Sequence, residues 1–86
     1  MRWPEDKLTR FEVARIIGAR ALQISFGAPV LVEGGDSLPP IEAAKQEFRN
    51  KIIPITIKRV LPTGEQIIVD TKKAVENWLS DHAGVI

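Results

Sequence analysis

The sequence contains no cysteine and no tyrosine, and it has a single histidine. Without cysteine the chain has no disulfide, no thiolate nucleophile and no cysteine-based zinc site. Its 12 lysines and arginines stand against 11 aspartates and glutamates, which leaves a formal net charge of +1. That balance argues against a protein whose main task is binding nucleic acid alone, because such proteins carry a large positive excess.

Long apolar runs are also missing. No stretch approaches the roughly 18 apolar residues of a membrane span, and residues 1–7 lack the apolar core of a signal peptide. We therefore expect a soluble cytoplasmic protein. With 86 residues, of which 44% are hydrophobic and 27% charged, the chain is long enough for one small globular domain.

A capping box marks the start of the first expected helix. Thr9 is a good N-cap residue, and Glu12 stands three positions later, where its side chain can reach back to the N-cap backbone. Gly27 favours the backbone conformation that follows a helix, and Pro29 prevents continuation. The spacing predicts a helix from Thr9 to about Phe26.

A second helix is expected to begin at Pro39 and Pro40 and to end near Asn50. Its apolar residues recur at helical spacing and are expected to face the core. This stripe consists of Ile41, Ala44 and Phe48.

The remaining sequence predicts a β-hairpin and a third helix. Residues 53–61 alternate as a half-buried strand does, residues 62–65 form a turn, and residues 66–69 form the return strand. A short helix then begins at Asp70 or Thr71 and ends near Gly84. Its apolar stripe consists of Val75, Trp78, Leu79 and His82.

The predicted fold class is α+β, a small single domain with two or three helices packed on a hairpin. Its expected organisation is an N-terminal arm over residues 1–8, a domain over 9–69 and a helical extension over 70–86.

The first helix is apolar around most of its circumference, which is unusual for a surface helix of a small domain. A stripe of small side chains runs along it, formed by Ala14, Gly18, Ala21 and Ser25. This stripe either packs against the rest of the chain or receives another protein, whose backbone it would allow to approach closely. Arg15 and Arg20 are either solvated side chains or forked donors to such a partner.

No catalytic arrangement is evident. Ser80, Asp81 and His82 are consecutive on a helix, so their side chains diverge and cannot form a triad. A local positive cluster, Lys51, Lys58 and Arg59, leaves open an alternative function as a free-standing nucleic-acid-binding module. From the residues alone we expect a non-catalytic interaction module without a cofactor.

Two segments resemble a known family. Residues 8–24, LTRFEVARIIGARALQI, closely resemble the hallmark helix of the small RNA polymerase assembly subunits. These are subunit K in archaea, the sixth common subunit of eukaryotic nuclear polymerases and omega in bacteria. Residues 27–30 and 53–64 follow in the family's order, and a long acidic N-terminal tail is absent, as in the archaeal form. Residues 31–40 resemble a variable connection, and residues 70–86, including Trp78, match nothing in the family's pattern.

The resemblance implies a non-catalytic subunit of DNA-directed RNA polymerase. Such subunits latch onto the C-terminal region of the largest subunit and promote assembly and stability. It also implies no metal, no cofactor and no strong direct binding to nucleic acid. The partner-binding residues that it indicates are Thr9, Arg10, Phe11, Glu12, Arg15, Gly18, Arg20, Leu22 and Gln23 on the helix, and Pro54, Lys58 and Arg59 on the hairpin.

Overall fold

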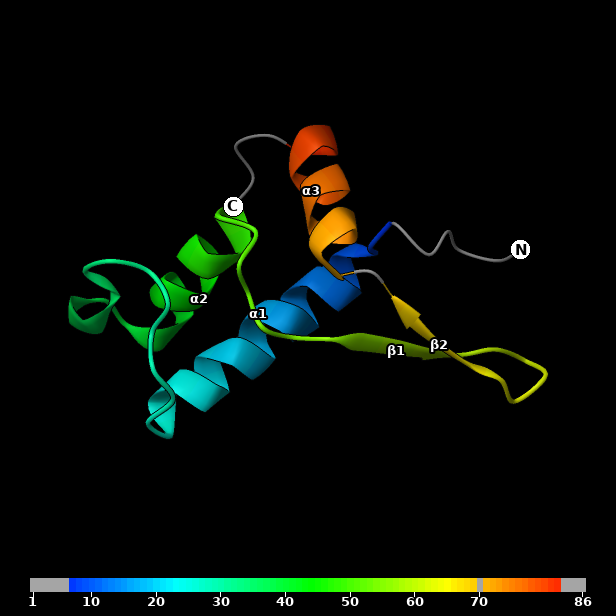
Figure 1. Cartoon of the computed structure of the whole chain (residues 1–86), viewed down its shortest axis with the longest axis horizontal. Coiled ribbons are helices and arrows are strands. Elements are labelled where there is room, and N and C mark those ends of the chain that lie inside the picture. Colours follow the sequence, from blue (N-terminus) through cyan, green and yellow to red (C-terminus); the bar gives the residue numbers. More distant parts are fainter. Residues whose placement is uncertain (1–6, 70, 83–86) are drawn as a thin grey trace.

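Three helices and one antiparallel hairpin make up the computed structural model, which describes residues 7–69 and 71–82 (Figure 1). This confirms the predicted α+β class. In chain order the elements are α1 (Arg10–Ser25), the short 3-10 helix η1 (Gly35–Ser37), α2 (Pro40–Arg49), β1 (Ile57–Val60), β2 (Gln66–Val69) and α3 (Thr71–Asp81).

Helix α1 begins and ends where the sequence predicts. The Thr9 hydroxyl accepts a hydrogen bond from the Glu12 backbone N–H at 3.1 Å, and the Glu12 carboxylate accepts one from the Thr9 backbone N–H at 2.9 Å. At the other end Gly27 has a φ of 102°, and its backbone N–H donates to the carbonyl of Ile24. This reversal satisfies carbonyls of the last turn and favours glycine, because an L side chain is strained at positive φ.

The core lies where α1 crosses α2 and where the hairpin and α3 close against them (Figure 1). Ile16 and Phe48 are fully buried at its centre. Ala44 is buried as predicted, but Ile41 is 43% exposed, so the predicted stripe is wrong at that position. Glu47 is buried in α2 and shifts the core-facing side of the helix away from Ile41.

A three-residue loop with a glycine bulge closes the hairpin. The Leu61 N–H donates to the Glu65 carbonyl at 2.8 Å, and the Gly64 N–H donates to the Leu61 carbonyl at 2.9 Å. Gly64 has a φ of 89°, as this loop type requires. The predicted strand over 53–61 is too long, because β2 has only four residues and pairing ends where Ile57 faces Val69.

Helix α3 packs on the core through Ala74 and Val75, both buried. His82, which the predicted stripe placed against the core, is exposed and stacks on the half-buried Trp78 ring at 3.6 Å. The expected cap Asp70 and stop Gly84 lie outside the described residues. None of the helices described has the length and hydropathy needed to span a lipid bilayer.

Candidate partner-binding surface

One side of α1 is buried, and the opposite side is apolar but exposed. On the exposed side Phe11, Leu22 and Phe26 keep 70%, 57% and 83% of their surface accessible. At 100° per residue these side chains lie about 180° from the buried ones. We call this side the α1 outer face; it consists of Phe11, Ala14, Arg15, Gly18, Leu22, Ser25 and Phe26, all exposed.

The small-residue stripe lies mainly on this outer face. Ala14, Gly18 and Ser25 are exposed, and a Cβ added at Gly18 would meet no atom within 4 Å apart from its neighbours and the backbone of its own helix. Only Ala21 packs against the core cluster. The sequence left open whether the stripe packs internally or receives a partner. Within the described residues most of the stripe does not pack internally, and they cover only one of the two apolar sides of the helix.

Polar side chains flank the outer face. The Arg10 guanidinium lies 5.4 Å from the centroid of the Phe11 ring, a cation–π contact on the surface. Arg15 is exposed and has no hydrogen bond or ion pair with other residues that the structure describes. Gln23 is exposed and accepts a hydrogen bond from Arg20 at 3.2 Å.

Arg20 itself is an internal residue, which corrects its assignment as a polar anchor for a partner. It is 4% exposed, and its Nε and Nη2 donate to the two carboxylate oxygens of Glu47 at 2.6 and 3.1 Å. Nη2 also donates to the Pro29 carbonyl at 2.6 Å. Glu47 accepts in addition from the Leu31 backbone N–H at 3.0 Å. Two helices and the loop that joins them thus meet at one buried, bidentate pair.

The burial of Glu47 was not predicted from the sequence. The sequence indicates this burial only through the position of Glu47. It stands directly before Phe48 and three residues after Ala44, and both of these residues are buried. A carboxylate on a core-facing side of a helix requires a buried cation, because burying an unpaired charge is prohibitive.

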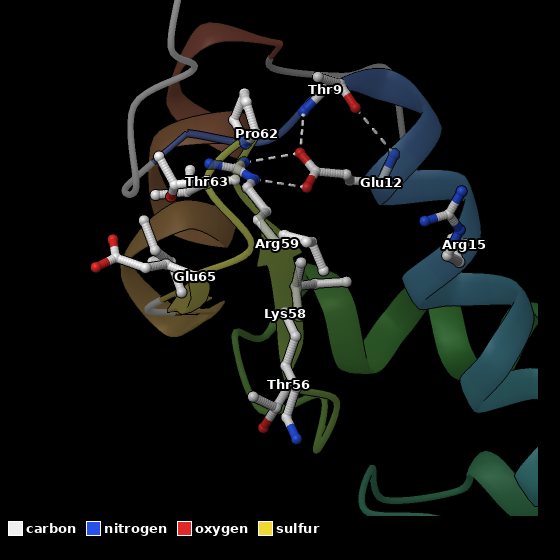
Figure 2. A pocket seen from close by; sticks show the side chains of 13 residues that line it. Thr9, Glu12, Arg15, Thr56, Lys58, Arg59, Pro62, Thr63 and Glu65 are labelled. Carbon is white, nitrogen blue, oxygen red and sulfur yellow. Dashed lines mark hydrogen bonds and ion pairs between the residues drawn. The ribbon is translucent and has the colours of Figure 1, made fainter.

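A second ion pair ties the start of α1 to β1 (Figure 2). The Nε and Nη2 atoms of Arg59 donate to the Glu12 carboxylate at 2.9 and 2.8 Å, and Arg59 also donates to the Lys7 carbonyl. The hydrogen bond from Arg59 lowers the pKa of Glu12, partial burial opposes this, and the hydrogen bond from the Thr9 backbone lowers it further. Three predicted partner-binding residues, Thr9, Glu12 and Arg59, therefore stabilise the chain itself.

Of the three partner-binding residues predicted on the hairpin, two line a groove and one does not. A groove between the first half of α1 and β1 is lined by Arg15, Lys58 and Arg59 among others (Figure 2). Lys58 is exposed there, whereas Pro54 is exposed but does not line the groove.

Two of the three positive charges behind the nucleic-acid alternative lie beside carboxylates. Arg59 is neutralised by Glu12, and Lys51 lies 3.9 Å from a carboxylate oxygen of Glu76. Only Lys58 keeps its charge uncompensated within the part of the chain described. Within the same part, no group of three or more histidine, aspartate or glutamate side chains has the geometry to hold a metal ion.

Comparison with known proteins places the chain in a family. Residues 5–55 match RNA polymerase Rpb6. The DNA-directed RNA polymerase subunit Rpo6 of Saccharolobus solfataricus is 44% identical over 72 residues, which is 81% of this chain and 76% of that protein. The subunit of the same name from Pyrococcus furiosus is 62% identical over 53 residues, 62% of this chain and 93% of that protein. As its resemblance to the polymerase assembly subunits predicted, the chain belongs to the RNA polymerase Rpb6 family.

Proposed function

We propose that this chain, an RNA polymerase subunit by family, is a non-catalytic subunit that docks through the α1 outer face onto the largest polymerase subunit. Docking near the C-terminal region of that subunit would promote assembly and stability of the enzyme. The observation that carries the proposal is the exposure of Phe11, Leu22 and Phe26 on one side of a helix whose other side is the core.

Water-exposed apolar side chains of this size, gathered on one side of one helix, are typical of protein-interaction sites. Ala14 and Gly18 lie between them and leave room for the close approach of another backbone. Arg10, Arg15 and Gln23 lie among and beside the apolar residues, where they can donate hydrogen bonds to carboxylates or carbonyls of the partner. The outer face therefore combines exposed apolar side chains with one cation among them, Arg15, and polar side chains beside them.

The two internal ion pairs support this function indirectly. Arg20–Glu47 fixes α1 on α2, and Glu12–Arg59 fixes its first turn on β1. A helix held at both places presents its outer face in one orientation, so little conformational entropy is lost on docking.

The test is Gly18→Leu, with Ser80→Leu on α3 as the matched control. Both replace a small, exposed helical residue, and leucine at position 18 has the higher helix propensity, so the free chain stays folded. We expect Gly18→Leu to reduce incorporation into polymerase at least tenfold in competition with the wild-type chain, and Ser80→Leu to leave it unchanged. Equal incorporation of Gly18→Leu and wild type would overturn the proposal.

A further inference from the structure

Strand β1 has one edge that no other strand covers in the part of the chain that the structure describes. The Leu61–Glu65 hydrogen bond makes these two residues a hydrogen-bonded pair, and such pairs alternate along an antiparallel ladder. In the observed register Val60 faces Gln66 and Lys58 faces Ile68, one and three positions away from that pair, so neither belongs to a hydrogen-bonded pair. The backbone N–H and C=O groups of Lys58 and Val60 therefore point away from β2.

The groove beside α1 runs along this edge (Figure 2). Residues 56–63 line it without interruption, although successive side chains of a strand point to opposite faces. Lining by successive residues of β1 shows that the groove borders the free edge of the strand. Ile67 of β2 lines it too, so the groove also extends over the face of the hairpin that Arg59 and Ile67 share. The opposite wall is one side of α1, formed by Thr9, Glu12 and Arg15.

The charges of the groove indicate what fits it. Arg59 is neutralised by Glu12, so Arg15 and Lys58 supply the uncompensated positive charge, while Glu65 lies at the turn end. Val60, 68% exposed, and the neighbouring Leu61 supply apolar surface. None of the residues lining the groove is aromatic, and aromatic side chains are what single-stranded nucleic acid usually stacks on.

From this geometry we propose that the free edge of β1 accepts an extended segment of another polymerase polypeptide as a third strand. The segment carries at least one acidic side chain, which lies within reach of Lys58. Its backbone pairs with the N–H and C=O groups of Lys58 and Val60, as in other cases of strand addition to an open edge. The inference rests on the proposed function for the source of the segment, but it concerns a surface that shares only Arg15 with the α1 outer face.

Backbone hydrogen exchange tests the pairing, with the chain free and incorporated in the whole polymerase. The matched controls are the amides of Gln66 and Ile68, which lie opposite Val60 and Lys58 and point to the outer edge of β2. We expect exchange at Lys58 and Val60 to slow at least tenfold on incorporation, and exchange at Gln66 and Ile68 to change much less. The inference is overturned if the chain is incorporated but amide exchange at Lys58 and Val60 does not slow, or if exchange slows only at the β2 amides. Either result leaves the proposed function intact.

Charge reversal tests the acidic character of the segment. Lys58→Glu is compared with Lys72→Glu, an exposed lysine of α3 that does not line the groove. We expect Lys58→Glu to lower incorporation in competition with wild type about tenfold and Lys72→Glu to have no effect. Equal incorporation of both variants contradicts the acidic segment. Failure of the wild-type chain itself to enter polymerase would overturn the proposed function, and this inference with it.

Discussion

Arg20 and Glu47 form a bidentate ion pair across α1 and α2, with side-chain exposures of 5% and 0%. The pair also holds the loop between the helices, through the Pro29 carbonyl and the Leu31 N–H. A charged pair in this position orients the two helices, but each member is tolerated only while the other is present.

Removing Glu47 alone should therefore be among the most damaging single changes in the chain. Glu47→Leu leaves the Arg20 guanidinium buried without its counter-charge, and we expect a loss of about 3–5 kcal/mol in the free energy of unfolding. Denaturant unfolding of the purified chain measures this value. A loss below about 1 kcal/mol would show that the pair is not sealed from water.

The double variant Arg20→Met/Glu47→Leu is the matched control. Because both charges are removed and apolar volume replaces them, we expect it to be more stable than Glu47→Leu, with a strongly non-additive double-mutant cycle. Additive effects would indicate that the two side chains act independently.

The capping box predicts a smaller, local effect. Thr9→Ala removes the hydroxyl that accepts from the Glu12 N–H, and we expect a loss of about 1 kcal/mol. Thr9→Ser keeps that acceptor and should stay close to wild type. Thermal unfolding distinguishes the two, since about 1 kcal/mol shifts the Tm of a chain of this size by roughly 4–8 °C.

The lowered pKa of Glu12 predicts that the stability of the fold depends on pH. Its folded-state pKa lies below the ordinary value of 4.5, mainly because of the hydrogen bond from Arg59. The ion pair therefore stabilises the fold fully above that value, and the contribution disappears as the pH falls through the lowered pKa. We expect Glu12→Gln to be less stable than wild type at pH 7 and the difference to vanish in acid. A stability difference that is the same at pH 7 and pH 3 would show that the carboxylate charge plays no part.

Lys51 occupies a position better suited to glycine. It follows the last residues of α2 with a φ of 61°, and its backbone N–H donates to the Phe48 carbonyl. A non-glycine residue in this conformation is strained by about 1 kcal/mol. The pair with Glu76 at 3.9 Å is exposed and contributes little. We expect Lys51→Gly to raise the Tm by several degrees, whereas Lys51→Ala should not; a decrease for glycine would contradict this.

The sequence predicted what local interactions determine. The capping box links Thr9 to Glu12, three residues away, and Gly27 ends the helix through contacts with the turn just before it. The structure confirms both predictions. The apolar excess of the first helix also predicted an exposed apolar face, because a short chain has too few other elements to cover every side of such a helix.

Long-range pairing escaped prediction. Arg20 and Glu47 are 27 residues apart, and each taken alone belongs to a residue type that is usually solvated. Arg59 and Glu12 are 47 residues apart, so residues that looked available for a partner hold the chain together instead. The length of β1 is set by the residues of β2 with which it pairs. The alternation of residues 53–61 carries no information about that pairing.

Site-specific photocrosslinking tests the central claim most directly. We would place p-benzoylphenylalanine at Leu22 on the α1 outer face and, as the control, at Ser80 on α3, and irradiate polymerase that contains either chain. The expected result is a crosslink from position 22 to the C-terminal region of the largest subunit and none to that region from position 80. An incorporated chain that crosslinks from position 22 only to another subunit, or to none, would contradict docking of this face on the largest subunit.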